Sequence, residues 1–537
     1  MTDCKCLGNA MAPANWDGPF IISPHDASAL YAGTNILWKT TDRGDSWQEL
    51  GDLTTGTDRR TLPIMGRMPH DHTPSLDDGI PYWPTISSVA ESPVARGLLY
   101  VGTDDGRFHV STDGGATWTD VAARDATDSD GPDEVAGRAV PTGFPGLPPG
   151  AWVSWIEPSR YNEARVYAVW NNYRNDDYAN YLYRSDDYGE TWTSITGNLP
   201  ADRVLRTVRE DLKSESVLFL GAEIGLFYTM DGGGHWTELR GGMPTAAFND
   251  LVIHPRENDL VLGTHGRGVW ILDQINALQE LTPEVMASAA HLFTVGPATQ
   301  IRRAGRQAHT GDVFYRGENP PNGAIIDYWL EAEAEPGAVS VVIEDGVGGR
   351  VATVEGTGRA GMNRVVWDLR HRVGDEAGTG GGGPGGFGGG GGRGPLVVPG
   401  NYTARLQVDG AGAVAGAQLA QPFEVHEDPR LNVTPATRSA WTATLLQLGE
   451  LRARAQRQLA RVEEALEAVA DDDESPRAAK LRDLEREFGE LVTRIGRLAG
   501  DIEGVVAPLT QDQRSRRVFY TDMLEVLVRE LEGVSDR

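Results

Sequence analysis

The chain has 537 residues, of which 40% are hydrophobic and 23% are charged, as in globular proteins of about three domains. Its formal net charge of −28 argues against nucleic acid or an anionic membrane surface as a partner, because both attract basic faces. The two cysteines, Cys4 and Cys6, exclude a disulfide framework. They could supply two metal ligands, but no partner ligands accompany them, so we predict no metal there. No apolar run is long enough to cross a membrane, and we expect no membrane insertion.

Four segments share the pattern Ser/Thr-x-Asp-x-Gly-x-x-Trp, which predicts a tight turn between two strands. In each box the Asp carboxylate is expected to accept backbone N–H bonds within the turn. The Gly is expected to supply a positive φ, and the Trp to open the next strand and bury its ring. We therefore predict structural roles for these residues: Asp42, Gly44 and Trp47; Asp113, Gly115 and Trp118; Asp187, Gly189 and Trp192; Asp231, Gly233 and Trp236.

Each box follows β-rich runs that predict strand, turn, strand, loop and strand, so that a repeat unit has four strands, A to D. The box forms the turn between C and D. A fifth copy, LVLGTHGRGVWILD at 260–273, has no box after it. Four-stranded units that repeat around an axis make a β-propeller, and we predict a mainly β fold with about five blades over residues 1–273.

These units resemble the Asp-box, or BNR-repeat, propellers of the sialidase superfamily, of xyloglucanases and of sortilin-like receptors. The resemblance is strongest to bacterial sortilin-like proteins labelled glycosyl hydrolases. It is carried by the four boxes and by ISPHDASALYAGTN, AESPVARGLLYVGTDDG and VIHPRENDLVLGTHGRGVWILD. It implies a secreted or periplasmic protein, although the first residues lack the pattern of a signal peptide. We expect this chain to be the C-terminal portion of a longer sequence, with an incomplete propeller and an exposed flank. A small closed propeller of four or five blades is the alternative.

The strand order places the boxes on one face and the B–C loops, with the links between blades, on the other. By analogy with other propellers, a ligand is expected on the second face. An arginine there could hold a carboxylate, and the acids could bind hydroxyls or act as the carboxylate pair of a glycosidase. The other interpretation is that these acidic residues bind no ligand and occur here because acidic residues are common in such turns. The candidate ligand-binding residues are Asp104, Asp105, Glu223, His265 and Arg267.

No catalytic set can be assembled from these residues. A sialidase-type site needs three arginines and a nucleophilic tyrosine, and only Arg267 stands in a suitable place. Long links at 51–84 and 121–150 could also carry function. The first contains His70, Asp71 and His72, then Asp77 and Asp78, which either ligate a metal or form an ordinary polar loop. We predict no catalytic residue, no metal and no cofactor.

Beyond the blades we predict a helical connector at 274–290 and β-strands at 291–430. The strand region resembles an immunoglobulin-like domain of the flagellar hook-capping type, through GMNRVVWDLR and PGNYTARL. A Gly-rich loop at 378–395 interrupts it and lacks the features of a nucleotide site. From 431 to 537, three apolar stripes at helical spacing predict a helical hairpin or three-helix bundle, or else an intermolecular coiled coil.

The predicted function is that of a ligand-binding propeller for a peptide or a glycan. The alternative is a glycoside hydrolase of the Asp-box type that acts on extracellular polysaccharide. Self-association is expected either through an open propeller edge or through the helical tail.

Overall fold

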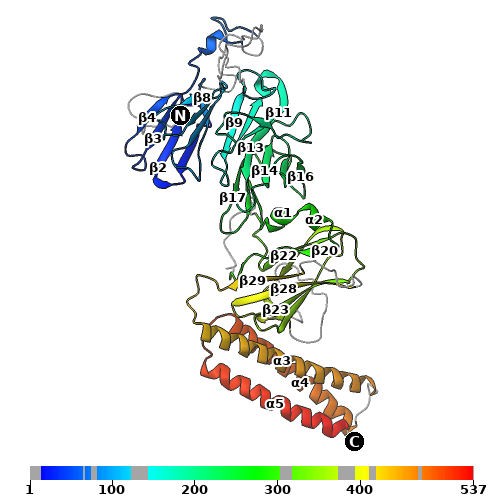
Figure 1. Ribbon diagram of the computed structural model, residues 1–537. Helices are drawn as coiled ribbons and strands as arrows, with labels where there is room; N and C mark the ends of the chain where they lie inside the picture. The colour runs from blue at the N-terminus through cyan, green and yellow to red at the C-terminus, as the bar shows by residue number, and fades with distance from the viewer. Residues whose placement is uncertain are drawn as a thin grey trace. The chain divides into compact units, whose positions relative to one another are not determined.

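The computed structural model describes residues 14–63, 67–73, 82–122, 143–302, 317–372, 393–409, 419–469 and 475–535. The chain forms two compact units, Met1–Leu281 and Thr282–Arg537 (Figure 1). Cys4, Cys6, Asp77, Asp78 and most of the Gly-rich loop lie outside the described residues. Within the described ranges, no helix is long and apolar enough to cross a membrane.

Unit 1 consists of five antiparallel sheets, and in each of them the strands pair in chain order. The predicted four-stranded repeat, with a fifth unit that lacks its last strand, is confirmed. We call the sheets blades 1 to 5. Blade 1 comprises β1 (Phe20–Ser23), β2 (Asp26–Gly33), β3 (Ile36–Thr40) and β4 (Gln48–Asp52); blade 2 comprises β5 (Ile86–Glu91), β6 (Leu99–Thr103), β7 (Phe108–Ser111) and β8 (Thr119–Asp120); blade 3 comprises β9 (Trp152–Pro158), β10 (Val166–Asn172), β11 (Asp177–Ser185) and β12 (Thr193–Ser194); blade 4 comprises β13 (Leu205–Glu210), β14 (Leu218–Ala222), β15 (Leu226–Thr229) and β16 (Thr237–Leu239); blade 5 comprises β17 (Phe248–Ile253), β18 (Leu260–Thr264) and β19 (Val269–Leu272).

The four boxes form the turns between the third and fourth strands, as predicted. Each box carboxylate accepts a hydrogen bond from the backbone N–H four residues later, at 2.8–2.9 Å. Each box glycine has φ between 89° and 102°. The prediction of four buried tryptophans holds for Trp192 and Trp236, whereas Trp47 and Trp118 are half-buried. Blades 1 and 2 therefore cover their box rings less completely than blades 3 and 4.

Neighbouring blades interlock where a glycine in a second strand faces the first strand of the next blade. A Cβ on Gly102 in β6 would overlap the Val153 side chain from β9. Gly33 in β2 stands in the same relation to Ile86 in β5. These close approaches let the sheets pack without a gap, and the side chains around them form continuous apolar clusters.

Unit 2 begins with the short helix α2 (Pro283–Met286), which follows α1 (Asn276–Glu280) at the end of unit 1. The predicted connector is thus two short helices. The β region of unit 2 has two larger sheets that share one apolar core and a separate two-stranded ribbon. The first sheet comprises β20 (Ala290–Leu292), β22 (Ala324–Leu330) and β25 (Gly361–Trp367); the second comprises β21 (Ala298–Thr299), β29 (Ala420–His426), β28 (Gly400–Val408), β23 (Val339–Asp345) and β24 (Arg350–Glu355); the ribbon comprises β26 (Arg370–Arg372) and β27 (Arg393–Leu396).

The unit ends in three long helices that lie side by side, α3 (Pro435–Glu467), α4 (Pro476–Glu503) and α5 (Gln511–Ser535) (Figure 1). Their apolar stripes meet in a single core, so the helices form a bundle. The helix starts follow the expected capping chemistry. The Thr434 hydroxyl accepts from the N–H of Thr437, and Thr510 and Gln513 exchange two hydrogen bonds between side chain and backbone.

Candidate functional site

Asp104 and Asp105, two of the five candidate residues, are buried at the loop between β6 and β7. Asp104 accepts hydrogen bonds from the N–H and the hydroxyl of Thr85, both at 2.7 Å. Asp105 accepts from the N–H of Thr55 at 2.7 Å and from the hydroxyl of Thr103. Both carboxylates therefore hold the long link before blade 2 in place, and neither is exposed to a ligand in this conformation.

Burial also changes the acidity of Asp104. Desolvation raises the pKa of its carboxyl to about 7, against the hydrogen bonds from Thr85, which favour the charged form. A raised pKa is often the mark of an acid–base residue, but here it belongs to a group that lies inside the protein. We conclude that Asp104 titrates near neutral pH as an internal loop anchor.

The other three candidates, Glu223, His265 and Arg267, are exposed. The backbone N–H groups of Asp104, Glu223 and His265 each donate to the carbonyl of the residue that precedes the first strand of the same blade, at 2.7–3.0 Å. These three residues thus occupy equivalent places in blades 2, 4 and 5. Within the described part of the chain, no hydrogen bond or ion pair joins His265 or Arg267 to Glu223.

Glu223 belongs instead to a group of aromatic and charged side chains that sequence reasoning did not single out. We call it the rim cluster, and it consists of Trp152, Tyr173, Arg174, Arg206 and Glu223. The Arg174 guanidinium lies 4.1 Å from the centre of the Trp152 ring and 4.6 Å from that of Tyr173. The Arg206 guanidinium lies 4.9 Å from the Tyr173 ring. One tyrosine ring therefore faces two guanidinium groups.

An ion pair completes the rim cluster. Arg206 Nε donates to Glu223 Oε2 at 2.9 Å, and the second nitrogen of the same guanidinium also contacts that oxygen. Burial opposes the charge on Arg206, but the hydrogen bond to Glu223, the charge of that carboxylate and the contribution of Tyr173 together raise the pKa of the guanidinium. Arg174 is exposed. The cluster therefore presents arginine stacked on aromatic faces at the protein surface.

The local folding of the chain explains how the rim cluster forms. Tyr173 and Arg174 lie in a single turn of 3-10 helix, Tyr173–Asn175, in the loop between β10 and β11. Trp152 opens β9, and Arg206 is the second residue of β13, so both come from the first strands of their blades. The packing of blade 4 on blade 3 thus brings Arg206 against Tyr173.

A second cluster lies along the first strands of blades 3, 4 and 5. Arg209 from β13 stacks on Trp155, with the guanidinium 4.4 Å from the ring centre. The same guanidinium donates to Glu157 Oε2 at 2.7 Å and to Asp250 Oδ1 at 3.3 Å. One arginine therefore joins carboxylates from the two flanking blades, which makes the inner strands a continuous polar strip.

The metal hypothesis for the first long link finds no support in the described residues. No group of three His, Cys, Asp or Glu side chains that could hold a metal ion occurs there. His70 and His72 are exposed, and His70 Nδ1 accepts the backbone N–H of His72 at 3.1 Å. One of the nitrogens that a metal would need is thus engaged in the turn.

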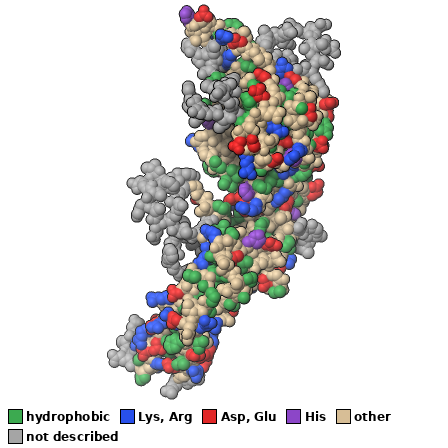
Figure 2. All heavy atoms as spheres, turned by 90° about the vertical axis from the view of Figure 1, so that its left-hand side faces the viewer, with side chains coloured by type: hydrophobic (Ala, Val, Ile, Leu, Met, Phe, Trp, Pro, Cys, Tyr) green, Lys and Arg blue, Asp and Glu red, His purple; other side chains and the backbone are tan. Residues whose placement is uncertain are grey.

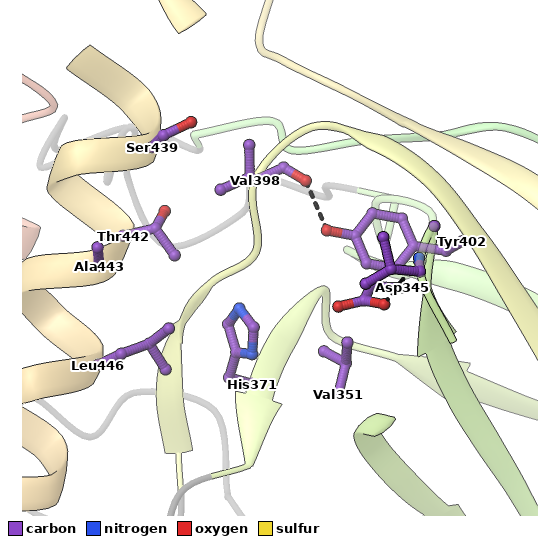
Figure 3. A pocket seen from close by; sticks show the side chains of 11 residues that line it. Asp345, Val351, His371, Val398, Tyr402, Ser439, Thr442, Ala443 and Leu446 are labelled. Atoms are coloured by element: carbon purple, nitrogen blue, oxygen red, sulfur yellow. Dashed lines mark hydrogen bonds between the residues drawn. The ribbon is translucent and has the colours of Figure 1, made fainter. Parts of the chain in front are cut away.

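Unit 2 contains a separate hollow of about 360 Å³ between its strands and helix α3. Figure 3 shows the His371 ring between the helix and the strand that carries Val351. Burial lowers the pKa of His371, so its imidazole is neutral at pH 7, although Asp345 opposes this shift. The Asp345 carboxylate accepts from the N–H groups of Val347 and Gly349 and is fixed by its own turn. The hollow could receive a small apolar group, but this set of side chains offers no acid–base pair.

Figure 2 shows one face of the molecular surface, on which acidic and basic side chains of the described residues are mixed.

Comparison with known proteins points to the same fold. A family model for sortilin, neurotensin receptor 3 (Sortilin-Vps10), matches residues 180–281. The chain is 27% identical over 233 residues to a probable oligoxyloglucan-reducing end-specific xyloglucanase of Neosartorya fischeri, over 42% of this chain and 24% of that protein. It thus spans about a quarter of this curated relative.

Solved structures of xyloglucan-cleaving and related enzymes are also similar. The GH74 xyloglucanase from Xanthomonas campestris is 16% identical, with a TM-score of 0.35, over 74% of this chain and 64% of the other. The Niastella koreensis GH74 enzyme is 14% identical, with a TM-score of 0.33, over 60% of this chain and 42% of the other. The family model and the curated relative support Asp-box propeller blades with distant xyloglucanase relatives, and they do not decide between ligand binding and hydrolysis.

Proposed function

We propose that unit 1 is a ligand-binding module of the sortilin-like Asp-box type, and that its rim cluster binds a carboxylate-bearing ligand, either an acidic glycan or a peptide. The observation that carries this proposal is the pair of arginines, Arg174 and Arg206, stacked against the same Tyr173 ring. Stacking holds a guanidinium in a fixed orientation, so that little freedom is lost when it binds a carboxylate through two parallel hydrogen bonds.

The charges of the cluster favour an anion. The cluster contains two guanidinium groups, those of Arg174 and Arg206, and one carboxylate, that of Glu223. This local positive charge lies on a protein whose formal net charge is −28. The surrounding negative charge would weaken non-specific anion binding, and an anion that binds here must gain from direct contact with the arginines.

Titration calorimetry with the full chain tests the proposal. Two ligand series are compared, oligogalacturonates against their methyl esters, and peptides with a free C-terminal carboxylate against amidated ones. We expect one acidic series to bind, its neutral counterparts to bind weakly, and Arg174→Ala to weaken binding about tenfold or more, as a charged hydrogen bond allows. Arg240→Ala is the matched control, because Arg240 is an exposed arginine paired with Glu238 near the box of blade 4. Equal binding of acidic and neutral ligands, or no effect of Arg174→Ala, would refute the site.

A second candidate function, glycoside hydrolysis, has one observation in its favour. Glu157 and Asp250 both reach Arg209, so two carboxylates from different blades approach one point on the inner strands. Glycosidases work with two such groups. Hydrolysis of xyloglucan oligosaccharides by the full chain, lost in both Glu157→Gln and Asp250→Asn, would favour this function over simple binding. If no product forms, the binding function stands alone.

We further propose that residues 291–430 form an immunoglobulin-like sandwich that acts as a spacer, and that the domain boundaries lie near 273 and 430. The two sheets that share one core in unit 2 are compatible with such a sandwich. A spacer should contribute nothing to ligand affinity, so substitutions such as His371→Ala should leave the titrations above unchanged.

A further inference from the structure

The blades of unit 1 share one kind of junction. We call the side of a blade that faces the next blade in chain order its forward face. In blade 4 this face consists of Phe219, Gly221, Leu226 and Tyr228, which pair across β14 and β15 and are all buried. They pack with Phe248 and other side chains of blade 5 in one apolar cluster. The forward face is therefore the surface through which a blade holds its successor.

Blade 5 carries the same face without a successor among the described residues. By strand register, Val261, Gly263, Val269 and Ile271 take the places of the blade 4 residues. Val269 is 69% exposed and Ile271 is 57% exposed. The nearest atom to a Cβ built on Gly263 belongs to Asp250 of its own blade, at 3.5 Å, whereas Gly221 packs against Phe248. Blade 5 thus has an exposed apolar surface of the kind that forms a junction. We call the space beside its glycine, Gly263, the socket, and no described residue of another blade occupies it.

Blade 1 presents the opposite side of such a junction. The first strand of each later blade directs an apolar residue toward the preceding blade, and these residues are buried: Val89, Ile156, Val208 and Leu251. Phe20 occupies the same register in β1, because it pairs with Ala32 as Val89 pairs with Val101. Phe20 is 59% exposed. In the described part of the chain, these two complementary faces are therefore both exposed.

We propose that the chain self-associates head to tail, with the forward face of blade 5 in one copy packed on the β1 side of blade 1 in a second copy. Every junction within the chain joins these two kinds of face, so the contact continues an established interface. Such a heterologous contact either closes into a ring or extends into a chain of copies.

The edge of β19 offers a different way to associate, which the test must separate. Within the described residues β19 pairs only with β18, so its other edge is open. Two copies could pair edge to edge there, in a symmetric dimer that leaves blade 1 uninvolved. The two arrangements differ in whether a change at Phe20 matters.

The experiment measures the mass of the full chain by light scattering and analytical ultracentrifugation over a range of concentrations. We expect a dimer or larger species that grows with concentration. Ile271→Asp and Phe20→Asp should each abolish it, because each would place a charge in an apolar interface. Both residues are exposed, and unchanged circular dichroism and melting will show that each variant is folded. A wild-type chain that stays monomeric at every concentration would overturn the proposal.

Mixing the two variants gives the sharpest result. The Ile271→Asp chain keeps an intact blade 1, and the Phe20→Asp chain keeps an intact blade 5, so the mixture should form a dimer of one copy of each. If Phe20→Asp still associates alone, the contact is the β19 edge and the head-to-tail arrangement is wrong. Phe519→Asp, at an exposed position on α5, is the matched control. Loss of association in that variant would assign the contact to the helical bundle instead.

Discussion

Blades 2 and 5 have equivalent glycines in their second strands, and a neighbouring blade covers the glycine only in blade 2. In blade 2, the Val153 side chain from the next blade occupies the space beside Gly102, and the side chains around this glycine are buried. In blade 5, Gly263 has the same register, but Val269 and Ile271 beside it are exposed. The difference teaches that the apolar face is a property of the blade sequence and does not depend on the presence of a neighbour. The energetic value of a junction can therefore be measured by comparing equivalent residues in filled and open positions.

The largest difference in the free energy of unfolding should appear between the removal of an aromatic ring from a filled junction and the removal of one from an open face. Phe248→Ala takes a buried ring out of the junction between blades 4 and 5, and we expect it to lower the free energy of unfolding by about 3–5 kcal/mol. Phe20→Ala removes an exposed ring and should change it by less than about 0.5 kcal/mol in the monomer. Chemical unfolding of both variants at low concentration, followed by tryptophan fluorescence, gives the comparison. Equal losses would mean that the β1 side of blade 1 is covered in solution.

The socket itself provides the next test. Gly102→Val would overlap Val153 and should destabilise the chain by roughly 1–3 kcal/mol, because the junction has no room for the added atoms. A Cβ on Gly263 meets no atom closer than 3.5 Å, so Gly263→Val should cost less than about 0.5 kcal/mol. Neither glycine has a positive φ, so the backbone accepts a side chain at both positions. A large loss in Gly263→Val would show that the socket of blade 5 is occupied in the monomer.

The contrast also shows what sequence can predict here. The boxes, the four-stranded unit and the helical stripes depend on spacing within a few tens of residues, and the structure confirms them. The rim cluster could not be predicted, because Arg206 of blade 4 meets Tyr173 of blade 3 only when the two blades pack side by side. The burial of Asp104 and Asp105 could not be predicted either, because it depends on hydrogen bonds to Thr85 and Thr55, which are distant in the sequence. Alternation in the first strands could have drawn attention to Trp152 and Arg206.

Asp104 in blade 2 extends the comparison to pH. The pKa of Asp104 is about 7 in the folded chain and about 3.9 in an unfolded one, so the folded state holds an extra proton between these values. The free energy of unfolding should therefore fall as pH rises from 4 to 7, by on the order of 1 kcal/mol per pH unit. Asp104→Asn should remove this slope, as seen in unfolding curves at pH 4.5, 5.5, 6.5 and 7.5.

The control for this slope is the box carboxylate of the same blade. Hydrogen bonds from Thr117 lower the pKa of Asp113, so its contribution is present above pH 4 and is lost only below it. Asp113→Asn should thus lower stability equally at all four pH values. If Asp104→Asn keeps the wild-type slope, Asp104 does not hold the proton and another group must.

The smallest effect should come from the box tryptophans, which repeat the contrast between filled and open junctions. In blade 4, Trp236 is buried and its Nε1 donates to the carbonyl of Ile195 in the preceding blade, at 2.8 Å. In blade 1, the described residues include no preceding blade, and the buried Nε1 of Trp47 has no partner. Trp236→Phe keeps most of the aromatic side chain but removes an N–H donor that has a partner, so it should lower the free energy of unfolding by roughly 1 kcal/mol. Trp47→Phe removes an N–H donor that has no partner, so it should leave the free energy of unfolding unchanged or raise it slightly. Differential scanning calorimetry at low concentration can measure both. Should Trp47→Phe cost as much as Trp236→Phe, the Trp47 indole must have a partner in solution, and the β1 side of blade 1 would then have to be covered rather than open.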